Sequence, residues 1–516
     1  MSNPTLSSWN KAVTSSSTSE EKKTCTSTAH VGRTMAFDEP TVFEQSVEGR
    51  KGYQTPKLDV PAFADKMLSA DLLRKKAAKL PELTETDITR HFTRLSSQNY
   101  AKDLGFYPLG SCTMKHNPKT ANVAASLPAF ELTHPLQDIA TAQGNLQICW
   151  EMQNYLAEIS GMDAISLWPC AGSHGEFVSL LVIRAYHAAQ GNPRKKVLIP
   201  DSAHGTNPAS AAVCGYDVVT LKSGPDGELH PETVKAAMDE EVAAIMITNP
   251  NTLGVFEENF KEISDIVHAK GGFVYCDGAN LNALMGAVQL GKIGADCMHF
   301  NLHKTFAVPH GGGGPGAGPI GVVKKLEPFL PKPIIQKNGD TFSVDHNRPH
   351  SIGMIKSFWG NFACTLRAYA YIRQLGKEGI KKTSQMAVLN AKYIRKRLEK
   401  AYHMPFRKPV LHECVLSDKI QNEYGVKTMD IAKRLMDYGF HPPTVYFPLI
   451  VPGALMIEPT ETENKQQIDA FCDAMLAIAD ECRETPEVVK TAPNVSFRAR
   501  LDEVRAAREV KVTAAL

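Results

Sequence analysis

Lys304 and Asp277 are the two residues of this chain whose types and spacing suggest chemistry most directly. Lys304 lies in the run Asn301-Leu-His-Lys-Thr-Phe306, 27 residues after Asp277 and just ahead of the glycine-rich run 311–316. A lysine amine can form a Schiff base with an aldehyde cofactor, and a carboxylate can keep a pyridine nitrogen protonated so that the ring withdraws electrons. The combination predicts a pyridoxal phosphate site with Lys304 and Asp277 as catalytic residues.

Two further runs could complete such a site. Ala171-Gly-Ser-His-Gly-Glu176 precedes a helical pattern, so the amides of Gly172 and Ser173 and the Ser173 hydroxyl could bind a phosphate at the helix N-terminus. His204 follows another apolar run and could lie flat on the pyridine ring or shuttle protons. Judged by the residues alone, an ordinary helix cap and a structural histidine are the alternatives.

Metal and dinucleotide sites are not predicted. His299 and His303 lie four residues apart, as metal ligands can, but we expect no carboxylate or cysteine nearby to complete the ligand set. The glycine-rich run can be matched to G-x-G-x-x-G, yet a β-like run rather than a helix follows it at 320–323. A backbone turn that approaches the cofactor closely explains these glycines better.

Composition describes a large globular protein. The 516 residues are 43% hydrophobic, and 57 basic against 55 acidic residues leave a net charge of +2, which gives no support for nucleic-acid binding. Eleven cysteines occur without a Cys-x-x-Cys pair, as is typical of reduced intracellular thiols. We see no membrane-spanning stretch and no secretory signal, so a cytoplasmic location is expected.

The middle of the chain alternates short apolar runs with helical patterns, which predicts repeated strand–helix units and a mainly parallel sheet. The expected strands are Lys196–Ile199, Asp217–Leu221, Ala243–Thr248, Gly272–Cys276, Cys297–Phe300 and Ile320–Val323. Helices are expected near Gly175–Ala189, Pro231–Met238 and Phe260–Ala269.

The rest of the chain suggests flanking units. One or two long helices are expected over Thr365–Tyr402, followed by a smaller α/β unit. Its strands are expected at Glu413–Leu416 and Ala454–Glu458, and its helices at Met429–Tyr438 and Lys465–Cys482. A capping box at Thr84–Asp87 predicts a helix start. We predict a mobile tail (1–35), an N-terminal segment with an active-site loop (36–135), a large cofactor-binding domain (136–364) and a small C-terminal domain (365–516).

Four longer motifs occur in order along the chain: Tyr107-Pro-Leu-Gly-Ser-Cys-Thr-Met-Lys115, Asp201-Ser-Ala-His-Gly-Thr-Asn-Pro-Ala-Ser210, Asp277-Gly-Ala-Asn-Leu-Asn282 and Asn301-Leu-His-Lys-Thr-Phe306 with Pro309-His-Gly-Gly-Gly-Gly-Pro-Gly316. Together they resemble one known family, the glycine decarboxylases or P-proteins of the glycine cleavage system. The resemblance covers most of the chain after residue 40.

Length places the chain within this family. Single-chain P-proteins are about twice as long, whereas split forms divide into two homologous subunits of which the second carries the cofactor lysine. The runs 348–353 and 357–362 also resemble the split form. The resemblance therefore implies the second subunit, a partner subunit 1, and two copies of each subunit. It implies the aspartate-aminotransferase-like fold type I of pyridoxal phosphate enzymes, with a large mainly parallel sheet domain and a smaller C-terminal α/β domain.

The resemblance also assigns roles to residues. Lys304 would hold the cofactor covalently, Asp277 would pair with the ring nitrogen, and His204 and Ala279 would lie on opposite faces of the ring. Gly172 and Ser173 would bind the phosphate, and His303 would also contribute to cofactor binding. The chain departs from the family pattern at Ala171 and His174, where the family is expected to have Asn or Ser and Gln.

The implied activity is that of glycine dehydrogenase (aminomethyl-transferring), an oxidoreductase. Glycine would lose CO2, and its aminomethyl group would pass to the lipoyl disulfide of the H-protein, which is the oxidant in place of NAD. The 107–118 loop, with Cys112 and His116, either lines a tunnel for the lipoyl arm or is structural. Arg348 is a candidate for the substrate carboxylate. An aminotransferase, a simple amino-acid decarboxylase and a non-catalytic scaffold remain the alternatives.

Overall fold

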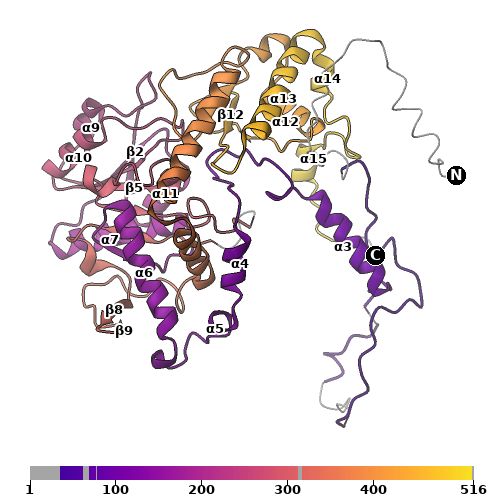
Figure 1. Cartoon of the computed structure of the whole chain (residues 1–516), viewed down its shortest axis with the longest axis horizontal. Helices are drawn as coiled ribbons and strands as arrows, with labels where there is room; N and C mark the ends of the chain where they lie inside the picture. Colours follow the sequence, from indigo (N-terminus) through magenta and orange to yellow (C-terminus); the bar gives the residue numbers. More distant parts are fainter. Residues whose placement is uncertain (1–34, 62–68, 77, 312–315, 514–516) are drawn as a thin grey trace.

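The computed structural model describes residues 35–61, 69–76, 78–311 and 316–513 (Figure 1). The expected mobile tail, apart from Met35, and the centre of the glycine-rich run lie outside these residues. Within the described ranges, ten cysteines are present and all are free thiols. No helix of these ranges has the length and apolar character that crossing a membrane requires.

A seven-stranded sheet forms the centre of the larger part, in the order β1-β7-β6-β5-β4-β2-β3. Strands β2 to β6 run parallel, whereas β7 runs antiparallel to both of its neighbours, β6 and β1. The strands are β1 (Ala164–Ser166), β2 (Lys196–Pro200), β3 (Asp217–Leu221), β4 (Val242–Thr248), β5 (Phe273–Asp277), β6 (Cys297–His299) and β7 (Ile320–Val322). The predicted mainly parallel sheet is confirmed.

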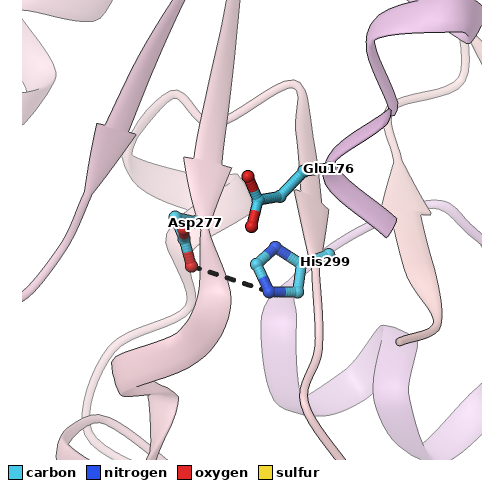
Figure 2. Close-up of side chains that lie close together, drawn as sticks. All are labelled: Glu176, Asp277 and His299. Atoms are coloured by element: carbon cyan, nitrogen blue, oxygen red, sulfur yellow. Dashed lines mark ion pairs between the residues drawn. The ribbon is translucent and has the colours of Figure 1, made fainter. Parts of the chain in front are cut away.

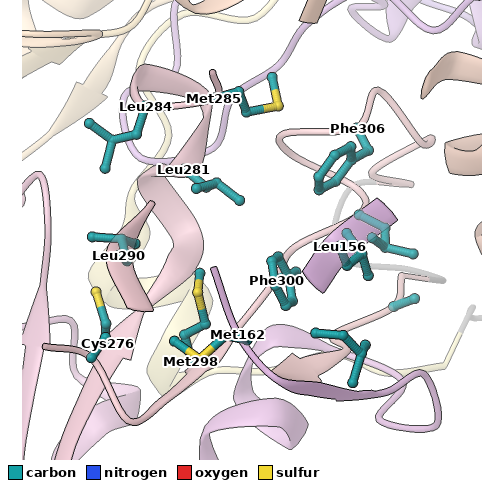
Figure 3. Close-up of a cluster of buried hydrophobic side chains, with 14 of the residues drawn as sticks. Leu156, Met162, Cys276, Leu281, Leu284, Met285, Leu290, Met298, Phe300 and Phe306 are labelled. Carbon is teal, nitrogen blue, oxygen red and sulfur yellow. The ribbon is translucent and has the colours of Figure 1, made fainter. Parts of the chain in front are cut away.

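Helices cover both faces of this sheet, which explains why all seven residues of β4 are buried. On one face, α7 (Gly172–Ala189) and α8 (Thr206–Val213) pack on Val197, Met246 and Tyr275. On the other face pack α6 (Gln143–Ser160), α9 (Pro231–Ala237) and α10 (Phe260–Ala269). Figure 3 shows part of this second core, with Leu156 of α6 close to Phe300 and Phe306, which flank Lys304 in the sequence.

The six predicted strands agree with the observed ones to within one residue at each end. The helix predicted near Gly175 begins earlier, at Gly172. Helix α6 was not predicted from the sequence, although five of its six buried residues, Leu146, Cys149, Met152, Leu156 and Ser160, recur every three or four positions. It also did not predict the three-residue β1 or the hairpin of β8 (Ile334–Asn338) and β9 (Thr341–Asp345).

The smaller C-terminal part is built on the antiparallel sheet β10-β12-β11. Its strands are β10 (Cys414–Ser417), β11 (Thr444–Val445) and β12 (Ala454–Ile457), covered by α12 (Thr428–Asp437) and α13 (Lys465–Glu484). The long helix α11 (Phe362–Leu398) connects the two parts and bends at Gly376, whose φ of 62° is left-handed. Its first half packs in the core of the large sheet, and its last turns pack in the small core.

The N-terminal segment joins both parts. Helix α3 (Glu85–Gln98) begins with the predicted capping box of Thr84 and Asp87, and it lies away from the large sheet (Figure 1). The chain then reaches the small sheet, where Leu109 pairs with Ile457, before α4 (Lys119–Ala125) packs on α11. The remaining short helices are α5 (Pro128–Glu131), η2 (Ile139–Thr141), η3 (Gly278–Ala283), η4 (Leu290–Ile293), η5 (Glu327–Phe329), η6 (Gln421–Tyr424), α14 (Pro486–Lys490) and α15 (Glu503–Arg508).

Candidate active site

A polar cavity of about 410 Å³ lies at the carboxyl ends of the parallel strands. This edge is where ligands bind in open α/β sheets, because the loops that follow the strands converge there. The cavity brings together every residue that sequence analysis assigned to catalysis or cofactor binding, although these residues are spread over 133 positions of the chain. They are Gly172, Ser173, His204, Asp277, Ala279, His303 and Lys304.

Asp277 is the last residue of β5, and its side chain is buried at the floor of the cavity. Its carboxylate accepts hydrogen bonds from Asn207 Nδ2 (3.1 Å) and from the Ala279 amide (2.9 Å). Burial alone would raise the pKa of Asp277, but nearby His299 and these hydrogen bonds outweigh it, so the pKa lies below its usual value. The environment of Asp277 thus favours a buried anion at the end of β5.

Asp277 has two close ionisable neighbours (Figure 2). Glu176 projects from α7 and His299 from β6. One carboxylate oxygen of each acid and one imidazole nitrogen of His299 all lie within 4.8 Å of one another. Asp277 Oδ1 lies 3.6 Å from His299 Nε2. Burial and the charge of Asp277 raise the pKa of Glu176 to about 8. The expectation that no carboxylate lies near His299 was wrong, because the fold brings Glu176 and Asp277 there from distant segments.

Lys304 lies in the turn that follows β6, and its side chain faces the cavity. The buried Lys115 supports this turn from behind, because its ammonium donates to the Thr305 carbonyl (2.9 Å). Asn117 Nδ2 donates to the Ala307 carbonyl (2.7 Å) in the same turn, where Ala307 has a positive φ of 55°. The 107–118 loop therefore holds the backbone on which Lys304 is mounted. Lys115 belongs to the first of the four family-like motifs, but its sequence position alone does not indicate this contact.

His204 and Ala279 lie on the cavity wall after β2 and β5 respectively. The His204 ring is exposed to the cavity, and its Nδ1 lies 3.0 Å from the Thr206 hydroxyl. The ring packs edge-on against Phe447 of the small domain, with 5.7 Å between the ring centroids. Burial and the charge of Lys304 lower the pKa of His204, which favours a neutral imidazole.

Gly172 and Ser173 form the first turn of α7, where backbone amides are free of intrahelical partners. A side chain at Gly172 would collide with Asn301 Oδ1. Glycine therefore allows α7 to lie close to the turn that carries Lys304, which we call the lysine turn. His303 lies beside His310 at this end of the cavity. Burial and the charge of Lys304 lower the pKa of His303 to about 3, so its imidazole is neutral.

Arg348 is not part of this site. Its guanidinium donates to the carbonyl (2.9 Å) and the carboxylate (2.8 Å) of Glu327, and Arg348 does not line the cavity. Arg348 therefore does not reach the cavity of this chain, and the structure does not support it as the ligand of the substrate carboxylate. Arg348 begins the run 348–353, which resembles the split form of the family. Membership of this run did not indicate where the Arg348 side chain points.

A buried carboxyl pair lies behind the 107–118 loop, in the small domain. Glu413 accepts from the Ser111 amide (2.8 Å), and Glu458 accepts from the Thr113 amide (2.9 Å). Both glutamates are fully buried, and both amide donors have left-handed backbones, with φ of 66° at Ser111 and 46° at Thr113. The carboxyl pair thus holds the loop in a conformation that non-glycine residues rarely adopt. Sequence analysis did not identify either glutamate.

Solved structures share this fold. A glycine decarboxylase (P-protein) of the glycine cleavage system superimposes with a TM-score of 0.67 at 21% identity, covering 80% of this chain and 94% of that chain. A sphingosine-1-phosphate lyase from Burkholderia pseudomallei gives a TM-score of 0.59 at 14% identity, covering 81% and 94%. The fold is accordingly that of the aspartate-aminotransferase-like, fold type I class of pyridoxal phosphate enzymes, as the resemblance predicted.

Sequence comparison narrows the class to one family. Residues 55–346 match the family described as glycine cleavage system P-protein, and residues 383–498 match the C-terminal domain of glycine dehydrogenase. A protein of Bacillus licheniformis named probable glycine dehydrogenase (decarboxylating) subunit 2 is 53% identical, covering 92% of this chain and 98% of that protein. A protein of the same name from Chlorobium chlorochromatii is 52% identical, covering 92% and 99%. The chain belongs to the glycine cleavage system P-protein family.

Proposed function

We propose that this chain is the cofactor-bearing subunit of a split glycine decarboxylase. It removes CO2 from glycine and transfers the aminomethyl group to the lipoyl disulfide of the H-protein. The observation that carries this proposal is the match over nearly the whole length to relatives named as the second subunit of glycine dehydrogenase. The shared cavity of Lys304 and Asp277 supports it.

The cavity fits pyridoxal phosphate. It offers an amine, a buried carboxylate and a helix N-terminus, the three groups that the aldehyde, ring nitrogen and phosphate of the cofactor require. Five buried polar atoms of cavity-lining residues have no hydrogen-bond partner within the described part of the chain: Thr248 Oγ1, Asn280 Oδ1, Asn301 Oδ1, His303 Nδ1 and His310 Nδ1. Buried polar atoms of this kind are normally satisfied, so a bound polar ligand accounts for them.

Each side chain then has a role. Lys304 would hold the cofactor covalently, and the Asp277 carboxylate would keep a proton on its ring nitrogen. His204 and Ala279 would contact the ring, Gly172 and Ser173 would bind the phosphate, and His303 would contact the cofactor from the turn that carries Lys304. The bound cofactor supplies an electron sink for the bond that glycine loses.

The overall reaction balances without a further oxidant. The C–C bond of glycine breaks and CO2 leaves, and the electron pair forms a C–S bond to one sulfur of the lipoyl disulfide. The S–S bond breaks, and the second sulfur takes up the proton that glycine releases, so carbon is oxidised and the disulfide is reduced. NAD takes no part in this step.

The name subunit 2, which the relatives carry, supports a partner subunit. We propose an assembly with P-protein subunit 1, two copies of each, that acts on the lipoylated H-protein in the cytoplasm. The 107–118 loop is anchored on both domains and contributes Ser111 to the cavity wall. We assign this loop to support of the lysine turn.

The test is exchange of the glycine carboxyl group with labelled bicarbonate by the chain co-expressed with subunit 1. Exchange is expected to depend on lipoylated H-protein and to disappear in Lys304→Ala. Transamination of an added keto acid without H-protein would instead identify an aminotransferase, and CO2 release without H-protein a simple decarboxylase. A chain that borohydride cannot label at Lys304 in the presence of pyridoxal phosphate would be a scaffold.

A further inference from the structure

Glu176 lies one turn into α7 and is nearly completely buried beside the cavity, yet no role in binding or catalysis has been assigned to it. Its two carboxyl oxygens have different partners. Oε1 accepts a hydrogen bond from the Thr206 hydroxyl (2.7 Å), and Oε2 accepts one from Asn207 Nδ2 (2.8 Å). One side chain therefore fixes two consecutive residues of the segment that follows β2.

Each of these two residues contacts a different cavity-lining side chain. Asn207 Nδ2 also donates to Asp277 Oδ2 (3.1 Å), and the Thr206 hydroxyl lies 3.0 Å from His204 Nδ1. Asp277 is placed for the ring nitrogen and His204 for the ring face. Glu176 is thus the common start of two chains of contacts, which we call arms. One arm runs through Asn207 to Asp277 and the other through Thr206 to His204, the two residues expected to orient the ring.

The charge state of Glu176 suits this position. Two ionised carboxylates side by side in a buried site repel each other, so one of them takes up a proton. Burial and neighbouring Asp277 raise the pKa of Glu176 to about 8, whereas the pKa of Asp277 lies below its usual value. With a proton on Oε1, the Glu176 hydroxyl donates to Thr206 Oγ1 while Oε2 still accepts from Asn207 Nδ2. At neutral pH, Glu176 can therefore hold both residues without placing a second negative charge next to Asp277.

We propose that Glu176 is a positioning residue, which aligns Asp277 through Asn207 and His204 through Thr206 so that both meet the cofactor ring in one orientation. This inference rests on the proposed function, because it requires a pyridoxal ring in the cavity. Glu176 does not touch the reacting atoms. It acts by limiting the orientations of the two side chains that do touch the ring.

The test compares Glu176→Ala with variants that remove one arm each, Thr206→Val and Asn207→Ala, in the holoenzyme co-expressed with subunit 1. Circular dichroism in the visible band of the cofactor reports ring orientation, and the rate of cofactor release reports retention. Glu176→Ala is expected to reduce the dichroic band and to weaken cofactor binding about 10- to 100-fold, since two hydrogen-bonded arms are lost. Each single-arm variant is expected to show part of this change.

Non-additivity distinguishes an anchor from a merely structural residue. The double variant Thr206→Val/Asn207→Ala is expected to match Glu176→Ala, and adding Glu176→Ala to it is expected to change nothing further. Glu176→Gln retains the side-chain volume and one acceptor, so its values are expected to fall between those of wild type and Glu176→Ala. If Glu176→Ala does not fold, the single-arm variants and Glu176→Gln still test the proposal.

Glu151→Ala is the matched control. Glu151 lies on α6 of the same domain and accepts hydrogen bonds from Tyr369 (2.6 Å) and Gln147 (2.7 Å), but it does not line the cavity. Its removal is expected to leave the dichroic band unchanged. A wild-type band in Glu176→Ala, Thr206→Val and Asn207→Ala would overturn the inference and leave the proposed function intact. Failure of the wild-type protein to bind pyridoxal phosphate would instead overturn the proposed function.

Discussion

At the scale of single residues, the candidate site is organised by the unequal ionisation of two neighbouring carboxyl groups. Asp277 is supported as an anion by hydrogen bonds and by His299, whereas Glu176 is kept neutral by burial and by the charge of Asp277. Neighbouring carboxyls whose environments push their pKa values apart commonly have different tasks. Here Asp277 supplies a negative charge, and Glu176 supplies hydrogen bonds that orient neighbouring side chains.

Replacing Asp277 with Asn tests the need for that charge, because the substitution keeps the shape of the side chain. Lys304 is expected to remain trappable with borohydride, while glycine turnover falls about 100- to 1000-fold, the usual effect of losing one well-placed electrostatic contact. Mass spectrometry of the labelled peptide and H-protein-dependent CO2 release measure the two effects. Asp296→Asn, which removes a hydrogen-bonded aspartate outside the cavity, is the control. Turnover of the Asp277 variant within a few-fold of wild type would contradict the assigned role.

At the scale of elements, the 107–118 loop connects the lysine turn to other parts of the molecule. The buried Lys115 ammonium contacts Asn282 Oδ1 (2.7 Å), Tyr371 Oη (3.2 Å) and Glu461 Oε1 (2.9 Å) in addition to the Thr305 carbonyl. These partners belong to η3, α11 and the segment after β12. One ammonium thereby joins both domains next to Lys304.

Lys115→Met is expected to destabilise the protein by about 3–5 kcal/mol, because it leaves the Glu461 carboxylate and several polar groups without their buried partner. Equilibrium unfolding in guanidinium chloride measures this change. Lys119→Met is the matched control, since Lys119 lies four residues further on and forms an exposed ion pair with Asp103. Such pairs contribute little, so the control should unfold like wild type. Equal stability of the two variants would show that Lys115 does not link the domains.

The carboxyl pair behind the same loop makes stability depend on pH. Burial raises the pKa of Glu458 to about 7, and burial together with Glu458 holds the pKa of Glu413 well above its usual value. The folded protein therefore keeps protons that the unfolded chain releases near pH 4.5. The contribution of these protons to the free energy of unfolding is complete below that pH and is lost as the pH rises through about 7. The free energy of unfolding falls by up to about 1.4 kcal/mol per pH unit for each proton.

Glu458→Gln, which mimics the protonated acid, is expected to flatten this decline. The free energy of unfolding of the cofactor-free chain, measured between about pH 5 and about pH 8, provides the comparison. The exposed Glu232→Gln should keep the wild-type slope. A slope unchanged by Glu458→Gln would mean that the pair does not retain its protons in the folded state.

The sequence predicted those elements whose signal is local. Apolar runs such as that of β4 located the parallel strands, and the positions of Asp277 and Lys304 after two of them placed both residues at one sheet edge. The contacts of Glu176, Lys115, Glu413 and Glu458 could not be predicted, because each joins segments that are far apart in the chain. The direction of the Arg348 side chain could not be predicted from the sequence either, because its contact with Glu327 is set by the fold.

At the scale of the whole molecule, we expect that the chain can bind its cofactor but cannot complete turnover alone. All the residues assigned to the cofactor lie in this one chain, so borohydride should label Lys304 in the isolated protein. H-protein-dependent glycine exchange is expected only after subunit 1 is added, together with a mass that corresponds to two copies of each subunit by light scattering. Full exchange by the isolated chain would remove the need for a partner.

Helix α11 contributes Ala368 and Ile372 to the large core and Ile394 and Leu398 to the small one. Melting either core would therefore remove packing from a helix on which the other core depends. The larger part and the smaller C-terminal part should therefore unfold together on heating. Scanning calorimetry of the isolated chain should record a single endotherm in place of two separate peaks.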